Sequence, residues 1–392
     1  MNIVQEDMLN ITEYKGLGKL PDPFRFDDGT TVKTKADWEK RRKEIYKTAI
    51  ELQYGTMPPK PEIFKVETLY VGGKGRSNSY LITAGTREKT VSFRMRLHLP
   101  TKEQFPFYSD KNPPVIVDGD LCFCYAMDKD FLNIAQNEGI AWAFFDRTEI
   151  AHDVLYEGRR QGALYEVYPE YTFGALGAWA WGYSRCVDAL ELLGLTDMSC
   201  VTFTGHSRGG KTAALAGALD ERAAIVNPNE TCAGACGCYR VHMSASYMGN
   251  KPERSETLAD LLHYFDFWMG PNLHEYADRE EDLPFDEHML KAMIAPRTLF
   301  ISEAAGDIWA NPIGSWQTTM AAKEVYRFLG AEENLFWYFR PGTHYHDLND
   351  VQMLANIICQ KTKGQKADER FFRLPFRAPE LIFDWRAPNT SV

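Results

Sequence analysis

The sequence lacks a long uncharged hydrophobic run. Its longest apolar-rich stretch without charge, residues 171–184, is shorter than the roughly 18–20 residues that a membrane-spanning helix needs, so we expect no membrane span. The first residues, MNIVQEDMLNITEYKG, hold no basic segment followed by an apolar one. The sequence therefore predicts no signal peptide in the chain as given, which fits a cytoplasmic protein or a secreted one whose leader has been removed.

The chain also lacks an excess of positive charge. Among its 392 residues, 54 are Asp or Glu and 44 are Lys or Arg, which gives a net charge of −10. Because nucleic-acid backbones are bound by clustered basic residues, this balance argues against a nucleic-acid partner. Hydrophobic residues make up 44% of the chain, which excludes intrinsic disorder and collagen-like architecture. We expect a folded protein with a large core.

Cysteine is scarce, with eight in the chain. That number is too small for a disulfide scaffold at this length, so we expect most of them to be free thiols. The closely spaced group Cys232-x3-Cys236-x-Cys238 contains no C-x2-C pair and has no histidine beside it at the usual ligand spacing. We therefore expect these three cysteines to pack within the protein and not to hold a metal.

What the sequence does contain is a change of hydrophobic pattern after Pro113-Pro114. Before it, residues 35–56 have the spacing of an amphipathic helix capped by Thr34 and Asp37, and residues 63–100 alternate as antiparallel strands do. After it, helix-length segments separate short apolar runs at 115–117, 140–145, 201–204, 223–226, 298–301 and 335–339.

Such runs are typical of strands buried on both faces of a mostly parallel sheet, with helices on both sides. We expect an α/β fold in a single domain. In it, residues 1–110 form an N-terminal helix and antiparallel strands, which pack on a catalytic core of residues 111–392.

Residues 205–212, GHSRGGKT, follow one apolar run and lead into an Ala-rich helical segment. They match G-x-S-x-G, the nucleophile elbow of α/β-hydrolases, with Ser207 as the nucleophile. The backbone N–H of Arg208 would then face the developing oxyanion. The same residues match G-x4-G-K-[ST], the phosphate-binding P-loop, so the motif alone does not decide between the two.

The rest of the chain favours the elbow. A hydrolase needs an acid and then a histidine downstream of the serine, each after a strand. Glu230 and Asp307 follow two of the apolar runs, and His344 and His346 follow the last one. A P-loop usually lies near the start of its domain and needs a Mg²⁺-binding Asp after a further strand. A nucleotide-binding P-loop protein stays as the rival hypothesis.

With these residues in place, the chain resembles the glucuronoyl esterases, carbohydrate esterase family 15, over nearly its whole length. The most specific block is SRGGK at 207–211, similar to the family signature G-x-S-R-x-G-K, followed by NPNE at 227–230. Further blocks lie at 20–24 and 283–288. The resemblance implies an α/β-hydrolase fold that needs no metal or cofactor. Fungal members join two cysteines at positions that look like His206 and Asp347 here, which makes this chain a bacterial-type member.

The resemblance also implies roles for individual residues. In the family, the Arg matching Arg208 assists the oxyanion hole, and the Lys matching Lys211 contacts sugar hydroxyls. The triad acid occupies one of two places, matching Glu230 and Asp307, and we favour Glu230. The remaining matches favour His346 over His344 as the base, place Trp309 in the sugar subsite, and put Glu256, a further substrate-binding candidate, where a Gln is often found.

We therefore expect a serine esterase that forms an acyl-enzyme and cleaves esters of (4-O-methyl-)glucuronic acid, as in glucuronoxylan–lignin links or their fragments. Its partner would be a small carbohydrate ester or a xylan-derived substrate. An esterase for another acylated carbohydrate on the same fold is an alternative. The sequence leaves open the alcohol half of the ester, the polymer length accepted, the oligomeric state and the compartment.

Overall fold

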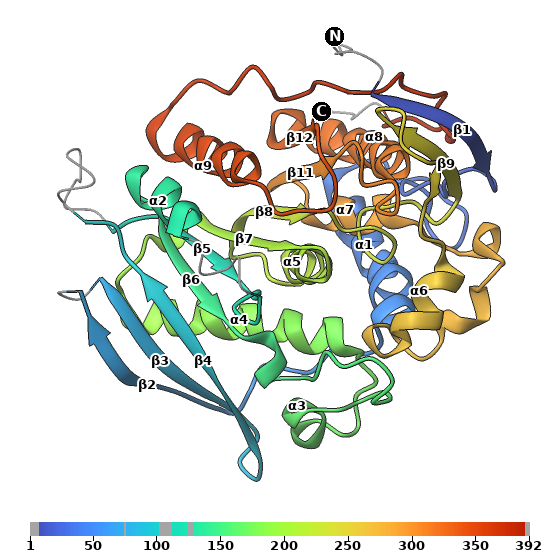
Figure 1. Ribbon diagram of the computed structural model, residues 1–392. Coiled ribbons are helices and arrows are strands. Elements are labelled where there is room, and N and C mark those ends of the chain that lie inside the picture. Colours follow the sequence, from blue (N-terminus) through green and yellow to red (C-terminus); the bar gives the residue numbers. More distant parts are fainter. Residues whose placement is uncertain (1–7, 74–75, 102–111, 124–128, 389–392) are drawn as a thin grey trace. The chain divides into compact units, whose positions relative to one another are not determined.

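The protein is described here by a computed structural model that covers residues 8–73, 76–101, 112–123 and 129–388 (Figure 1). By its internal contacts the chain divides into two compact units, each built from separate segments. Unit 1 consists of residues 1–56, 229–345 and 370–392, and unit 2 of residues 57–228 and 346–369. The single domain with a division near residue 110 remains a prediction.

The strands of unit 2 follow one another in the order β8-β7-β5-β6-β4-β3-β2. Strand β5 runs parallel to both β6 and β7, whereas β4 pairs antiparallel with β6 and continues into an antiparallel meander. The bounds are β2 Ile63–Gly72, β3 Ser77–Gly85, β4 Thr90–His98, β5 Val115–Asp118, β6 Ala141–Phe145, β7 Val201–His206 and β8 Ala223–Asn229. The predicted parallel strands with an antiparallel N-terminal extension are confirmed.

Burial explains why the two kinds of strand have different sequences. Every residue of β6 and of β7 is buried, as expected for strands covered on both faces. Strand β4 instead alternates between exposed and buried residues, because one of its faces meets solvent. The continuous apolar runs in the sequence are thus the strands covered on both faces, and the alternating segments are the strands with one face in solvent.

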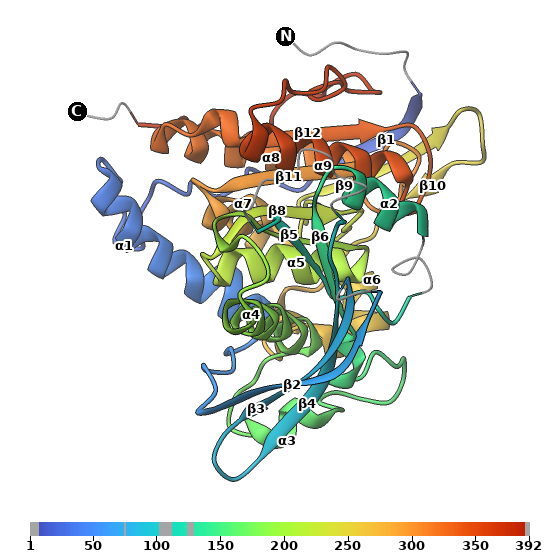
Figure 2. The same cartoon turned by 90° about the vertical axis from the view of Figure 1, so that its left-hand side faces the viewer.

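Helices cover both faces of the unit 2 strands (Figures 1 and 2). On one face lie α2 Lys129–Asn137 and α9 Leu348–Lys363, and on the other lie α4 Ala175–Leu193 and α5 Arg208–Leu219. A short helix, α3 Ala163–Val167, and 3₁₀ turns at Arg147–Glu149 and Met198–Cys200 complete the unit.

Helix α4 fixes the strand ends at which the serine motif begins. The hydroxyl of Tyr183 donates to the carbonyl of Thr204 at 2.7 Å and accepts from the N–H of Gly119 at 3.0 Å. One buried side chain thereby ties the ends of β5 and β7 together.

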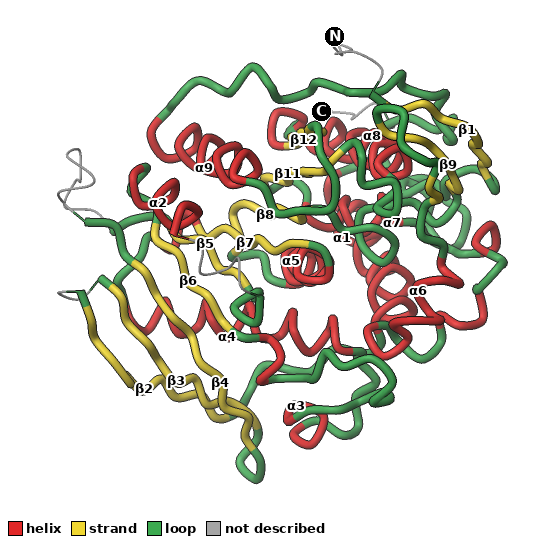
Figure 3. Tube along the Cα trace, in the orientation of Figure 1, coloured by secondary structure: helices red, strands yellow, loops and turns green. Residues whose placement is uncertain are grey.

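Unit 1 contains two groups of strands (Figure 3). Strands β1 Leu9–Gly16, β9 Val241–Tyr247 and β10 Glu253–Arg254 form an antiparallel sheet, and β11 Thr298–Ala304 pairs in parallel with β12 Leu335–Arg340. The helices are α1 Lys35–Ile45, continued by π-helical Tyr46–Leu52, then α6 Leu258–Phe265, α7 Glu287–Ile294 and α8 Pro312–Leu329. 3₁₀ turns lie at Asp266–Trp268, Leu273–Tyr276, Glu280–Asp282 and Glu332–Asn334.

The helix predicted near residues 35–56 begins as its sequence indicates. Thr34 is the N-cap, and its hydroxyl accepts from the N–H of Asp37 at 3.1 Å. The Asp37 side chain returns the interaction to the cap backbone, which completes a capping box. The helix is therefore confirmed, with a change to π-helical winding at Tyr46.

The last segment of the chain contributes to the core of unit 1. Phe383 packs in a buried cluster with Leu20, Val241 and Ala321, and the indole N–H of Trp385 donates to the carbonyl of Leu20 at 2.9 Å. Phe383 and Trp385 are thus joined by packing to residues as far away in the sequence as Leu20.

No helix in the described part of the chain is long and apolar enough to span a membrane. The seven cysteines within the described ranges are all free thiols, which confirms the expectation that most cysteines are unpaired.

His288 links two of the sequence blocks that carry the family resemblance. Its ring is fully buried, and Nε2 donates to the carbonyl of Pro21 at 2.9 Å. Burial lowers the pKa of His288 to about 4, because a buried imidazolium loses its hydration. The folded protein therefore holds this ring neutral at pH values where an exposed histidine is charged.

We predict that His288 makes the protein acid-sensitive. The pKa of His288 is lower in the folded state than the usual value near 6.5, so the unfolded chain binds this proton more tightly. The folded state therefore has its full stability above about pH 6.5 and loses stability as the pH falls toward 4. At pH 4 the loss amounts to about 3 kcal/mol. Urea unfolding at pH 7 and pH 4 should show a smaller drop in stability for His288→Gln than for the unaltered chain. The exposed His263→Gln should match the unaltered chain, and an unchanged pH dependence in His288→Gln would contradict the prediction.

Candidate active site

The serine of the G-x-S-x-G motif lies in a strained turn. Ser207 is the one residue between β7 and α5, and its backbone has φ 57° and ψ −119°. Positive φ is costly for a residue with a β-carbon and is found where a site requires it. The turn presents the hydroxyl at the N-terminus of α5, as the nucleophile elbow does.

Two glycines make this turn possible. A β-carbon on Gly205 would lie 2.5 Å from the backbone of Gly209, and a β-carbon on Gly209 would lie 2.1 Å from the carboxylate of Asp120. Both distances are too short for any side chain. The glycines of the motif are therefore explained by close packing.

The same geometry excludes the P-loop reading. In a P-loop, the residues between the two glycines form a loop whose N–H groups surround phosphates. Here Gly205 and His206 still belong to β7, and Arg208 already opens α5. The P-loop hypothesis is therefore wrong, because the motif contains no loop that could enclose a phosphate.

Asp120 is a site residue that the sequence reasoning missed. Its Oδ2 accepts from the N–H of His206 at 2.8 Å, and its Oδ1 accepts a short hydrogen bond from Arg147. Both side chains are completely buried. Asp120 and Arg147 each follow a buried strand, β5 and β6, so the strand-end rule used for the downstream acids would have found them.

Arg208 is held in place by the same network. Its Nη1 donates to Asp153 Oδ1 at 3.1 Å, and the other oxygen of Asp153 accepts from Arg147 at 3.3 Å. The side chain of Arg208 remains 29% exposed, which leaves room for contact with a ligand. Lys211 lies one turn further along α5 and is buried.

His346 also belongs to unit 2 and lies beside the elbow. Its ring stacks on His206 with centroids 5.5 Å apart and an interplanar angle of 4°, and it meets Phe131 edge-on at 4.9 Å. Asp347 is the N-cap of α9. The positions that the resemblance linked to a fungal disulfide are thus a stacked histidine and a helix cap.

The downstream acids and the other histidine lie together in unit 1. His344 Nδ1 and Asp307 Oδ2 are 2.5 Å apart. Burial raises the pKa of the Asp307 carboxyl, but hydrogen bonds with His344 and Glu230 and the charge of His344 outweigh it, so the pKa lies below its ordinary value. The structure thus pairs His344, the histidine that the sequence did not favour, with one of the two predicted acids.

Arg340 is a second site residue that the sequence reasoning missed. At the end of β12, its guanidinium donates to Glu230 Oε1 at 3.1 Å and to the carbonyls of Pro341, at 3.2 Å, and Tyr345. It therefore binds the acid and both ends of the short loop that carries His344. Glu230 itself is fully buried, and its N–H donates to the carbonyl of Ser302 in β11.

The two predicted substrate residues of unit 1 have different surroundings. Trp309 is partly exposed, and the Arg254 guanidinium lies 5.5 Å from its ring centre. Glu256 is buried, and its Oε2 accepts from the N–H of Ala233 at 3.2 Å. Glu256 thereby holds the loop that follows Glu230, a structural contact that does not test its predicted role in substrate binding.

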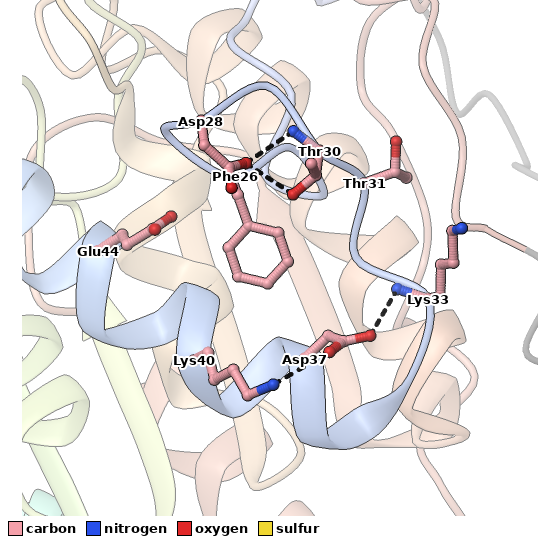
Figure 4. Close-up of a pocket in the computed structure, with 8 residues that line it drawn as sticks. All are labelled: Phe26, Asp28, Thr30, Thr31, Lys33, Asp37, Lys40 and Glu44. Carbon is pink, nitrogen blue, oxygen red and sulfur yellow. Dashed lines mark hydrogen bonds and ion pairs between the residues drawn. The ribbon is translucent and has the colours of Figure 1, made fainter.

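A separate pocket of about 700 Å³ in unit 1 contains none of these residues (Figure 4). Its charged groups bind one another and the adjoining backbone. Asp28 accepts from the N–H and hydroxyl of Thr30 at 2.8 and 2.6 Å, and Asp37 lies 3.6 Å from Lys40. We therefore do not place the active site there.

We predict that the buried pair behind the elbow is important for stability. Arg147→Met leaves the buried carboxyl group of Asp120 without its cation, which should cost about 3–5 kcal/mol. Arg94→Met is the matched control, because Arg94 pairs with Glu149 at 2.7 Å but is 58% exposed and should lose less than about 1 kcal/mol. Urea unfolding measures both variants, and equal losses would contradict the prediction.

The comparison with known proteins agrees with the resemblance. A family model described as glucuronyl esterase of fungi matches residues 82–330. The 4-O-methyl-glucuronoyl methylesterase of Podospora anserina is 32% identical over 332 residues, which cover 84% of this chain and 64% of that protein. This chain thus spans slightly less than two thirds of that relative's length.

Solved structures give the same result. A carbohydrate esterase family 15 glucuronoyl esterase from Caldicellulosiruptor kristjansonii has a TM-score of 0.81 at 30% identity, with 95% of this chain and 98% of that chain covered. A serine-to-alanine mutant of the glucuronoyl esterase from Sporotrichum thermophile, solved with methyl 4-O-methyl-beta-D-glucopyranuronate, has a TM-score of 0.72 at 25% identity, with 95% and 94% covered. These likenesses confirm the predicted α/β-hydrolase fold.

The family model alone spans more than half of the 392 residues. Taken with the relative that is 32% identical across 84% of the chain, it shows that this chain belongs to the glucuronoyl esterase family, carbohydrate esterase family 15.

Proposed function

We propose that this chain is a serine esterase that hydrolyses esters of glucuronic acid or 4-O-methyl-glucuronic acid through an acyl-enzyme on Ser207. The observation that carries the proposal is the strained backbone of Ser207, φ 57° and ψ −119°, between β7 and α5. The name of the Podospora relative and the ester bound to the Sporotrichum enzyme support the substrate class.

The proposed base is His344. A triad histidine needs a carboxylate on one ring nitrogen, which fixes the tautomer and stabilises the imidazolium, and an accessible second nitrogen. His344 has Asp307 at Nδ1 and a side chain that is 42% exposed. We therefore propose His344 in place of the sequence-based choice, His346, whose ring stacks on His206 and meets Phe131 edge-on.

The proposed orienting acid is Asp307, in place of the favoured Glu230. Asp307 makes the described hydrogen bond to His344, and Glu230 in turn bonds to Asp307. Glu230 and Arg340 then form the layer behind the acid, where the guanidinium offsets the charge of the two carboxyl groups. Arg340 is a positioning residue in this scheme.

The reaction proceeds in two transfers. Ser207 Oγ attacks the ester carbonyl while His344 Nε2 takes the hydroxyl proton, and the same proton then leaves on the alcohol as the C–O bond breaks. Water attacks the acyl-enzyme with His344 again as base. The new carboxylic acid is released, and Ser207 regains its proton.

The charge that develops on the carbonyl oxygen would be stabilised by the backbone N–H and the side chain of Arg208. Such donors accelerate the step because they meet full negative charge only in the tetrahedral state. Lys211 would bind sugar hydroxyls, and Trp309 would pack on a pyranose face. Glucuronoxylan–lignin esters or their fragments are the proposed natural substrates.

We predict that the unaltered chain hydrolyses glucuronate esters and that Ser207→Ala lowers kcat by on the order of 10⁶. The assay compares methyl glucuronate, methyl 4-O-methyl-glucuronate and benzyl glucuronate with acetylated xylose and glucose. The exposed Ser199→Ala is the matched control and should keep full activity. Faster turnover of the acetylated sugars would favour the alternative esterase, and retained activity in Ser207→Ala would refute a serine mechanism.

We predict that the two histidines differ sharply in the same assay. His344→Phe should lower kcat by roughly 10⁵–10⁶, because it removes the proton acceptor. His346→Phe keeps an aromatic ring to stack on His206 and should change kcat by less than about tenfold. The opposite ranking would restore His346 as the base.

The two acids check this assignment. Asp307→Asn should cost roughly 10⁴ in kcat, as for a triad acid, and Glu230→Gln should cost less. If Glu230→Gln is the more damaging change, the acid is the one favoured from the sequence. If only the double variant is inactive, the two carboxylates are interchangeable.

A further inference from the structure

Three metal-binding side chains meet beside the proposed base. The sulfur of Cys232, a carboxylate oxygen of Asp307 and a ring nitrogen of His344 all lie within 4.8 Å of one another. They come from three loops of unit 1, which follow β8, β11 and β12. Thiolate, imidazole and carboxylate are the ligands that Zn²⁺ prefers in proteins.

We propose, in place of the sequence-based expectation that Cys232 holds no metal, that Cys232, Asp307 and His344 form an inhibitory site for a thiol-seeking divalent transition metal of the Zn²⁺ type. The metal is not part of the reaction. It occupies the histidine that the proposed mechanism needs, so the inhibition, though not the binding, rests on the proposed function.

The distances suit a small adjustment to metal geometry. With metal–ligand bonds of about 2.0–2.3 Å, the ligand atoms of a tetrahedral site lie roughly 3.3–3.7 Å apart. The three donors here need to approach by about 1 Å at most, while the 2.5 Å contact between His344 and Asp307 opens. The fourth position remains for water.

The loop that carries Cys232 is fixed. Cys232 has φ 56°, in the left-handed region. Its carbonyl accepts from the N–H of Gly237 at 2.9 Å, and a β-carbon on Gly237 would lie 2.8 Å from that carbonyl. The hydrogen bond and the close approach of Gly237 hold the backbone of this turn, and the turn fixes the position of the Cys232 thiol.

Charge and access also favour binding. The carboxyl group of Glu230 lies beside that of Asp307 and adds a second acidic side chain to the site. The side chain of His344 is 42% exposed, so an ion in solvent can reach this ligand directly. Binding exchanges the thiol proton of Cys232 for a metal–sulfur bond and releases one proton, while His344 contributes a ring lone pair.

Cobalt(II) tests the site directly, because a thiolate ligand gives Co²⁺ a charge-transfer band in the near ultraviolet. The band should appear in the unaltered chain and in Ser207→Ala, and it should be absent from Cys232→Ser and from His344→Asn. Cys236→Ser is the matched control, since it changes another buried thiol of the same loop and keeps all three ligands. Absence of the band from the unaltered chain, or its persistence in Cys232→Ser, would overturn the proposal.

Zn²⁺ provides the second readout. It should inhibit ester hydrolysis by the unaltered chain and by Cys236→Ser, and a chelator should restore the rate. Each rate is expressed relative to the rate of the same chain without Zn²⁺. On this scale, Cys232→Ser should need at least about tenfold more Zn²⁺ than the unaltered chain for the same fractional inhibition. Equal inhibition of both chains would refute the site. A cobalt band without any hydrolysis of glucuronate esters would instead leave the metal site standing and refute the proposed function.

Discussion

The carboxylate of Asp120 occupies the space that a side chain on residue 209 would fill, 2.1 Å from the position of a β-carbon. Because Gly209 leaves that space open, Asp120 can accept a hydrogen bond from the N–H of His206, the last residue of β7. It also holds Arg147, which shares Asp153 with Arg208. The strained backbone of Ser207 and the position of Arg208 therefore depend on the close contact between the Asp120 carboxylate and Gly209.

The acids of unit 1 depend on a comparable chain of contacts that begins at Arg340. One guanidinium binds Glu230 and two carbonyls of the loop around His344, and Glu230 bonds to Asp307, which bonds to His344. Removing a carboxylate from water is costly unless a cation and hydrogen bonds replace its hydration. Arg340 supplies both, so two carboxyl groups can be buried together beside one histidine.

The sequence predicted the parts of this structure that follow from hydrophobic pattern. Buried strands, the capped helix at Thr34 and the strand-end positions of Glu230 and Asp307 all leave local signals. The choice between His344 and His346 does not, because two residues that are two positions apart follow the same strand, and the loop path alone decides which one meets Asp307. The spacing of residues in the sequence also could not show that Cys232 lies near His344. Zinc motifs are recognised by short sequence spacings between their ligands, whereas Asp307 and His344 lie on loops far from Cys232 in the sequence. Strand β9, which is buried only in part, and the short β10 were also missed.

Unit 1 consists of three separate segments of the chain, and this limits how early in synthesis its core can form. Phe383 and Trp385 pack against Leu20 and its neighbours, so two segments that are 365 positions apart in the sequence share one core. During synthesis from the N-terminus, part of the apolar surface around Leu20 stays uncovered until Phe383 and Trp385 leave the ribosome. The core of unit 1 is therefore completed late in synthesis, and its earlier segments remain open to non-native association until then.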